Sequence, residues 1–248
     1  MHMKYMLSLL FFCIGSLLLA QDSGMVKYEE DISFEIPPEM KARMKDIPSN
    51  VQASKILVFE GQKMSYVEGE EEVDDAFSRG RKNRWVRYMA GSRASTKFFD
   101  MEAGLFMEKT NRYRKEFLIQ DTVEAIQWKI SAGEQRDILG YTCMKGIYQR
   151  DSTTIEAWFT PQIPVSMGPD GLHGLPGLIL AVGYGENKAI LAKEILLDPE
   201  EGVTLTTLSP SKKALSRQEF DTLMEERREE MKKMWGGNAK RRKMRGNY

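Results

Sequence analysis

Cysteine and histidine are scarce in this sequence, and their scarcity excludes several kinds of site. The chain of 248 residues holds two of each. His2 and Cys13 lie in an N-terminal segment that we expect to be removed, which leaves Cys143 and His173. One cysteine cannot close an internal disulfide, and a zinc site built from Cys and His needs about four ligands. A Ser-His-Asp triad could use only His173, so the composition disfavours zinc chemistry and triad catalysis.

An excess of charge of one sign is also absent. Lys plus Arg and Asp plus Glu each total 36, which leaves the chain as a whole without a drive toward nucleic acid or anionic lipid. Locally, residues 68–75 are acidic and residues 79–97 are basic, with Trp85 and Tyr88 among the bases. Bases interleaved with aromatics are typical of nucleic-acid binders, but we favour a solvated loop whose opposite charges neutralise each other. We therefore expect no nucleic-acid partner.

Long apolar runs are absent except near the N-terminus. Lys4 precedes an apolar stretch over residues 6–19, and Ala20 follows it. A basic residue, an apolar run of this length and a small terminal residue form the pattern of a secretory signal peptide. We expect residues 1–20 to be cleaved after Ala20 and the protein to be exported, either to the periplasm or to the outer membrane. An uncleaved anchor is the alternative.

Residues 21–215 are predicted to form one antiparallel β domain. Val26, Tyr28 and Ile32 share one side of an extended chain over 25–36, the two-residue period of a strand with one exposed face. Similar segments recur about every ten residues, with turn residues between them. Further strands are expected over 53–61, 62–70, 113–122, 125–133, 135–150, 153–164, 178–182 and 189–197, with two more inside 96–110 around a turn at 101–104.

This pattern defines the expected fold class. No stretch alternates strands with helices, as a parallel βαβ fold requires. The prediction is a mainly β protein with an antiparallel sheet, for which a curved or half-barrel form is considered beside a sandwich and a closed barrel.

The end of the chain is predicted to be helical. Ser216 and Glu219 have the spacing of an N-terminal capping box, and apolar residues then recur at helical spacing. These residues are Phe220, Leu223, Met224, Met231, Met234 and Trp235. We expect an amphipathic helix over 216–235, ended by two glycines, and a basic disordered tail over 236–248. Packing on the sheet is the favoured role of the helix, docking to a partner or membrane is the alternative, and the tail is a candidate for peripheral contact with anionic lipid.

Glycine is concentrated in one place. It recurs at every third position from 168 to 177, directly before the apolar run 178–182. Gly-Pro-Asp-Gly over 168–171 is a tight-turn sequence, because proline presets φ and Asp-Gly favours turns. The run that follows fits a strand buried on both faces, paired with 189–197. We expect a structural role, with Gly177→Val destabilising the fold by about 1–3 kcal/mol.

The same glycine-rich stretch carries a resemblance to a known family. Residues 174–179 read GLPGLI, and WKI (128–130), ILGYTCMK (138–145) and AWFTPQIPVSMGP (157–169) precede it in order. The chain over about 95–197 thus resembles the GLPGLI family of exported Bacteroidetes proteins, a Porphyromonas-type group. The resemblance implies an exported, mostly β protein and no known activity.

The sequence leaves several functions open. The favoured hypothesis is a non-enzymatic cell-envelope module that holds an apolar ligand or binds an outer-membrane or periplasmic protein, and we expect no cofactor. One alternative is an accessory component of an outer-membrane transport or secretion machine. Another is a soft-metal site, because methionine, cysteine and histidine suit copper(I). An enzyme with Cys143 as nucleophile and His173 as base remains a less favoured alternative.

The candidate binding residues follow from these hypotheses. The glycine-rich motif supplies the first group if it forms a surface rather than a buried turn. The candidates are Gly174, Leu175, Pro176, Gly177, Leu178 and Ile179, together with Cys143, Trp158 and His173.

Overall fold

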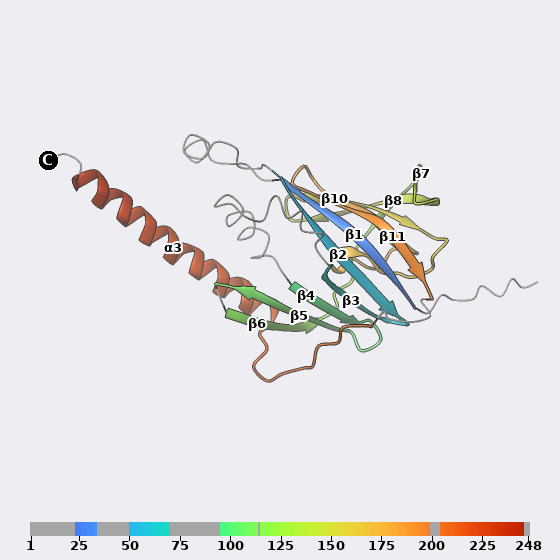
Figure 1. Cartoon of the computed structure of the whole chain (residues 1–248), viewed down its shortest axis with the longest axis horizontal. Coiled ribbons are helices and arrows are strands. Elements are labelled where there is room, and N and C mark those ends of the chain that lie inside the picture. Colours follow the sequence, from blue (N-terminus) through green and yellow to red (C-terminus); the bar gives the residue numbers. More distant parts are fainter. Residues whose placement is uncertain (1–22, 34–49, 70–94, 114, 199–203, 246–248) are drawn as a thin grey trace, which may run out of the picture.

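One open β-sheet dominates the structure (Figure 1). It is seen in a computed structural model that describes residues 23–33, 50–69, 95–113, 115–198 and 204–245. The strands in these residues are β1 (Ser23–Ser33), β2 (Asn50–Glu60), β3 (Lys63–Glu68), β4 (Ser95–Asp100), β5 (Leu105–Arg112), β6 (Lys115–Thr122), β7 (Lys129–Ile138), β8 (Tyr141–Arg150), β9 (Thr153–Thr160), β10 (Leu178–Tyr184) and β11 (Lys188–Leu197). Each pairs antiparallel with its neighbours in the sheet. The predicted signal peptide and most of the charged segment 68–97 lie outside the described residues.

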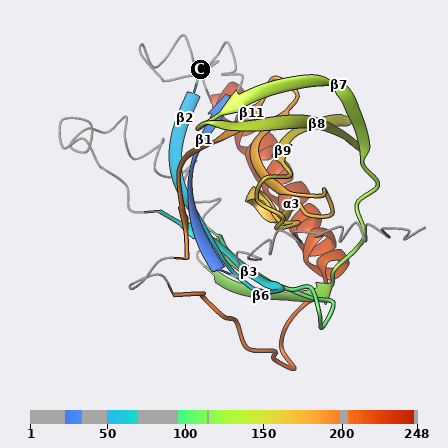
Figure 2. The ribbon, with the colours of Figure 1, turned by 90° about the vertical axis from the view of Figure 1, so that its right-hand side faces the viewer.

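The first strand lies at the centre of this sheet. The spatial order is β6-β5-β4-β3-β2-β1-β11-β10-β9-β8-β7. The chain therefore runs outward from β1 to β6, crosses to the opposite edge, and returns until β11 pairs with β1. Residues 123–128 make the crossing, and we call them the strap. Figure 2 shows the sheet curved into an arc with β6 and β7 at its two ends. The prediction of a mainly β fold with an antiparallel sheet is confirmed, and of the forms considered the sheet has the curved, open one.

Residues with positive φ form the tight turns between strands. Gly61 (φ 55°) separates β2 from β3 at the predicted boundary between two strands, and Gly104 (φ 62°) precedes β5 at the predicted turn over 101–104. Leu139 (φ 52°) and Gly140 (φ 83°) form a turn that the sequence pattern did not reveal. The prediction of one strand over 135–150 is therefore wrong: this segment contains the end of β7, the turn and β8. Leucine rarely adopts positive φ, which explains the omission.

The hydrophobic core lies on the concave side of the arc. Residues 161–177, which join β9 to β10, lie inside the arc and are called the plug (Figure 2). Its apolar side chains join those of strands from both halves of the sheet in one buried cluster. Members of the cluster include Val26, Tyr28, Leu57, Phe59, Phe99, Phe159, Ile163, Leu172, Leu175 and Ile190. The concave side is thus filled by the chain itself.

The segment before the terminal helix contacts the sheet at the interior strand β3 and at the edge strand β6. The backbone N–H of Thr206 donates to the hydroxyl of buried Ser65 at 3.1 Å. Leu215 then forms a parallel bridge with Ile119, and its backbone N–H donates to the carbonyl oxygen of Leu118 at 2.9 Å. Edge strands with unpaired backbone groups favour association with other chains, and Leu215 pairs with the middle of β6 at this edge.

The terminal helix α3 (Arg217–Arg245) leaves the sheet after its first turns (Figure 1). Phe220 is buried, Leu223 and Met224 are half-buried, and residues 225–230 are exposed. The predicted end at Gly236-Gly237 is wrong, because helical backbone continues to Arg245 through most of the expected disordered tail. Each glycine weakens a helix by only about 1 kcal/mol, and good helix formers follow this pair. In the described part of the chain, no helix is both long and apolar enough to cross a membrane.

Candidate functional site

The plug depends on backbone conformations that few side chains permit. Asp170 has φ 58° and Gly171 has φ 85°, in the short 3-10 turn at Pro169–Gly171. A Cβ atom on Gly171 would lie 2.5 Å from the ring of Phe99. Glycine is needed there both for φ and for close approach, and asparagine and aspartate tolerate positive φ better than most residues. The predicted Gly-Pro-Asp-Gly turn is therefore present.

Backbone hydrogen bonds fold the plug back on itself. The N–H of Leu178 donates to the carbonyl oxygen of Ile163 at 2.9 Å, and that of Ile179 donates to Met167 at 3.0 Å. The N–H of Gly174 donates to Ser166 at 3.2 Å. Because buried backbone groups need partners, these bonds give a segment without regular strand structure a defined conformation.

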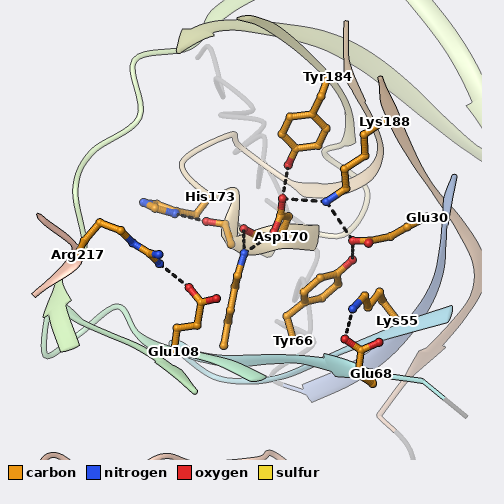
Figure 3. A network of polar contacts seen from close by, with 12 residues as sticks. Glu30, Lys55, Tyr66, Glu68, Glu108, Asp170, His173, Tyr184, Lys188 and Arg217 are labelled. Carbon is orange, nitrogen blue, oxygen red and sulfur yellow. Dashed lines mark hydrogen bonds and ion pairs between the residues drawn. The ribbon is translucent and has the colours of Figure 1, made fainter. Parts of the chain in front are cut away.

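The carboxylate of Asp170 anchors the plug to the sheet (Figure 3). It forms an ion pair with Lys97 of β4 and another, at 3.1 Å, with Lys188 of β11. The hydroxyl of Tyr184 in β10 also donates to it at 3.0 Å. One plug residue is thereby bound to strands that lie on both sides of the sheet's centre.

The network continues from Lys188 to the central strand. Its ammonium lies 3.3 Å from the carboxylate of Glu30 in β1, which also accepts a hydrogen bond from the Tyr66 hydroxyl at 2.8 Å. Tyr28, which makes an edge contact with the Tyr66 ring, donates its hydroxyl to the backbone oxygen of Ile179 at 2.6 Å. Two carboxylates and two ammonium groups thus form a connected, charge-balanced cluster.

Electrostatics keep this cluster ionised despite its burial. Burial alone would raise the pKa of Asp170, but the positive charges of Lys97 and Lys188 outweigh it and hold that pKa well below its usual range. Burial raises the pKa of Tyr28, and burial with the negative charge of Asp170 raises that of Tyr184. The tyrosines therefore act as neutral hydrogen-bond donors. These groups are bound to one another, which makes them structural anchors rather than reactive groups.

Two further ion pairs lie beside this network (Figure 3). Arg217, the first residue of α3, pairs with Glu108 of β5, and its guanidinium lies 5.3 Å from the ring centre of Phe106. Lys55 pairs with Glu68 on neighbouring strands. The first of these pairs fixes the start of α3 to the concave side of the sheet.

His173 joins the plug to the strap. Its Nδ1 lies 2.9 Å from the backbone oxygen of Gly171, and its Nε2 lies 3.0 Å from the backbone oxygen of Glu124 in the strap. A second contact joins the same two segments: the indole N–H of Trp128 in the strap donates to the backbone oxygen of His173 at 2.8 Å. The Trp128 ring also packs against Tyr148, with 5.7 Å between ring centres. The strap therefore lies across the plug and is hydrogen-bonded to it.

The structure divides the predicted motif residues into two groups. Leu175, Leu178 and Ile179 are fully buried, whereas Gly174 and Pro176 are exposed. A Cβ atom on Gly177 would lie 2.1 Å from the backbone oxygen of Thr160. The buried members and the close contact at Gly177 agree with a structural role for most of the motif.

The other candidates do not gather at one site. Cys143 is buried, and burial raises the pKa of its thiol to about 11, so it is a poor nucleophile. Trp158 lies under the guanidinium of Arg136, 4.5 Å from the ring centre. No described contact joins Cys143 or Trp158 to His173. The described residues also contain no cluster of three or more His, Cys, Asp or Glu side chains that could hold a metal.

Sequence reasoning missed the anchoring network. Asp170 was recognised only as a turn residue, and nothing marked Lys97 or Lys188 among the many lysines. Lys97 and Lys188 are largely buried, unlike most other lysines that the structure describes, and this burial depends on pairing between strands far apart in the chain. The one available signal is an acidic residue at the centre of an otherwise apolar, glycine-rich stretch.

The fold and its interior define a class of protein: an open antiparallel half-barrel filled by its own plug. Residues 146–181, which include β9, the plug and the start of β10, match the model of Porph_ging, a family described as proteins of unknown function. No curated protein matches the chain. Two solved structures of PNGF-II are similar, at 16% and 14% identity over 72% and 79% of this chain, with TM-scores of 0.47 and 0.48. The matches cover 29% and 31% of the PNGF-II chains, so this chain spans under a third of their length.

Proposed function

We propose that this protein is an exported cell-envelope module of the GLPGLI type that binds a protein partner through α3 and has no catalytic role. In this proposal, residues 1–20 are a signal peptide cleaved after Ala20. The partner is an outer-membrane or periplasmic protein with an acidic surface, for example a component of a transport or secretion machine.

The observation that carries the proposal is the contrast between the sheet and α3. The concave side of the sheet is occupied by the plug, whose Asp170 is held by ion pairs from two strands. Beyond Met224, in contrast, the described side chains of α3 are exposed. At 1.5 Å per residue, its 29 residues extend over about 43 Å. An element of that length outside the core is available for binding.

Charge indicates the chemistry of the partner. Residues 240–245, at the end of α3, include five bases and no acid. Basic groups attract an acidic surface over roughly 10 Å at physiological salt and accelerate docking to it. The middle of the helix, residues 225–230, is entirely charged, which favours a polar interface over insertion of an apolar face.

The other functions considered from the sequence receive less support. An apolar ligand on the concave side would have to displace the plug and break the Asp170 ion pairs. Cys143 is a buried, protonated thiol, and His173 is bonded to backbone oxygens, which argues against a nucleophile and base. A copper site would need ligands brought together, and Met64 and Met107 are instead fully buried on β3 and β5.

Site-specific crosslinking in the native cell envelope tests the proposal. A photoreactive amino acid replaces Arg228 or Lys233, which are exposed on α3, and Lys193 on β11 serves as the matched control. We expect one adduct of defined mass from both helix positions and none from the control. Replacing the five bases of residues 240–245 with glutamine should abolish it.

Three results would contradict this function. The first is an equal adduct from the Lys193 position, and the second is no protein adduct at all. The third is adducts with lipid alone that also depend on the five bases, which would assign α3 to peripheral contact with an anionic membrane. Circular dichroism of each variant confirms that the sheet remains folded.

A further inference from the structure

The imidazole ring of His173 is bonded in a way that depends on its protonation. Its Nδ1 faces the backbone oxygen of Gly171 at 2.9 Å, and its Nε2 faces that of Glu124 at 3.0 Å. Carbonyl oxygens only accept hydrogen bonds. A neutral imidazole has one N–H, so one of the two contacts would then place two acceptors against each other. Only the doubly protonated ring donates to both.

We propose that His173 is a proton-dependent clasp that holds the strap on the plug. With two protons, the ring bonds Gly171 within the plug and Glu124 in the strap. With one proton, the ring keeps the bond inside the plug and the contact with Glu124 is lost. The plug side is retained because Gly171 is only two residues away and buried, whereas Glu124 is in an exposed part of the strap.

The charged groups around His173 are mostly neutralised by one another. Asp170 of the plug pairs with Lys97 of β4, and Glu108 of β5 pairs with Arg217 of α3. Asp121 at the end of β6 accepts a hydrogen bond from the backbone N–H of Arg217. On the strap, Glu124 faces the ring with its backbone oxygen, and on β4 the nearest aromatic neighbour is the uncharged ring of Phe99, at 6.0 Å. The positive charge of a doubly protonated His173 is therefore stabilised chiefly by the two carbonyl oxygens.

The direction of the effect follows from proton balance. The closed form has taken up one proton from solvent that the open form lacks, so lower pH favours closure and higher pH favours release. Histidine is the side chain suited to this task between about pH 5 and 8. The effect requires no partner on α3 and thus goes beyond the interaction proposed above. It makes the attachment of the strap to the plug responsive to pH.

Nuclear magnetic resonance of the full chain with nitrogen-15 histidine tests the clasp. The second histidine of the chain, His2, lies in the proposed signal peptide, and His173→Gln identifies the His173 signal by its loss. We expect both ring nitrogens of His173 to carry protons at low pH and only one at high pH. A ring with a single proton on nitrogen over the whole range would overturn the proposal.

Trp128 reports whether the strap responds. The chain has four tryptophans, and replacing Trp85, Trp158 and Trp235 by phenylalanine leaves this one. Its emission should change with the same midpoint as the His173 resonances. His173→Gln should abolish that transition.

Two outcomes of the fluorescence experiment would contradict the clasp. One is a titrating His173 without any change at Trp128, and the other is the same Trp128 transition in His173→Gln. Should the glutamine variant fail to fold, the paired titrations of the unsubstituted His173 still decide the matter.

Discussion

At residue 177, the absence of a side chain determines how closely the plug approaches β9. A Cβ atom there would lie 2.1 Å from the backbone oxygen of Thr160, which cannot rotate away. The residue also has φ 153°, where side chains are unfavourable. Gly177→Val should therefore destabilise the fold by about 3 kcal/mol, at the upper end of the range expected from the sequence. Urea unfolding measures this change.

Gly183 in β10 is the matched control. A Cβ atom there meets nothing within 4 Å. Gly183→Ala should change the free energy of unfolding by less than about 0.5 kcal/mol, as surface substitutions usually do. Equal losses at positions 177 and 183 would show that the close contact at Gly177 is not what limits stability.

Asp170 supports a second prediction at this scale, because its charge is what binds the plug. Asp170→Asn keeps the shape and tolerance of positive φ but leaves Lys97 and Lys188 without their shared partner. At neutral pH the loss should be about 2–3 kcal/mol, less than for a fully buried pair. Asp151→Asn, at an exposed turn with similar φ (52° against 58°), should be nearly neutral.

The pH dependence of Asp170→Asn has a definite sign. The pKa of Asp170 is depressed in the folded state, so its stabilisation is present above the unfolded value of about 4 and is lost as pH falls below it. The stability difference between the variant and the original chain should therefore shrink below about pH 4. A difference that stays constant down to pH 2 would contradict the assigned role of the charge.

At the scale of elements, the start of α3 is held by a capping box that the sequence predicted. Glu219 accepts hydrogen bonds from the backbone N–H of Ser216 at 2.8 Å and from its hydroxyl at 2.9 Å. These bonds lower the pKa of Glu219. Ser216→Ala should reduce stability by about 1 kcal/mol and reduce helical signal at 222 nm. Ser152→Ala, on an exposed turn, should do neither.

Local patterns explain which elements could be predicted. The alternation of apolar and polar residues identified β1. The glycine at position 61 marked the boundary between β2 and β3. The turn at Leu139 was missed because its first residue is atypical there. The end of α3 was placed too early, because a pair of glycines was given more weight than the helix formers after it. In both cases the conformational preference of one or two residues was outweighed by the residues around them in the chain.

At the scale of the whole molecule, the strand order could not be predicted. β1 and β11, the first and last strands along the chain, pair with each other, so that Gly24 lies opposite Leu197. No local pattern encodes such a pairing, and the candidate site shares this limit. Asp170 and Lys97 are 73 residues apart, and His173 and Glu124 are 49 apart. The sequence revealed the plug as a turn-rich segment, but its partners depend on how the folded sheet brings distant strands together.

The central place of β1 makes a prediction about the whole fold. β1 joins the two halves of the sheet, contributes buried Val26 and Tyr28 to the core, and binds the start of β10 through the Tyr28 hydroxyl. A chain without residues 1–33 should therefore lose cooperative unfolding, because β2 and β11 would become unpaired edges and Lys188 would lose Glu30, one of its two carboxylate partners. A chain without residues 1–22 should unfold in one transition, and so should one that ends at Met224, which retains the packed start of α3. If the chain without β1 unfolds as cooperatively as these two, each half of the sheet is stable alone, and β1 is then an added strand rather than the element on which the fold depends.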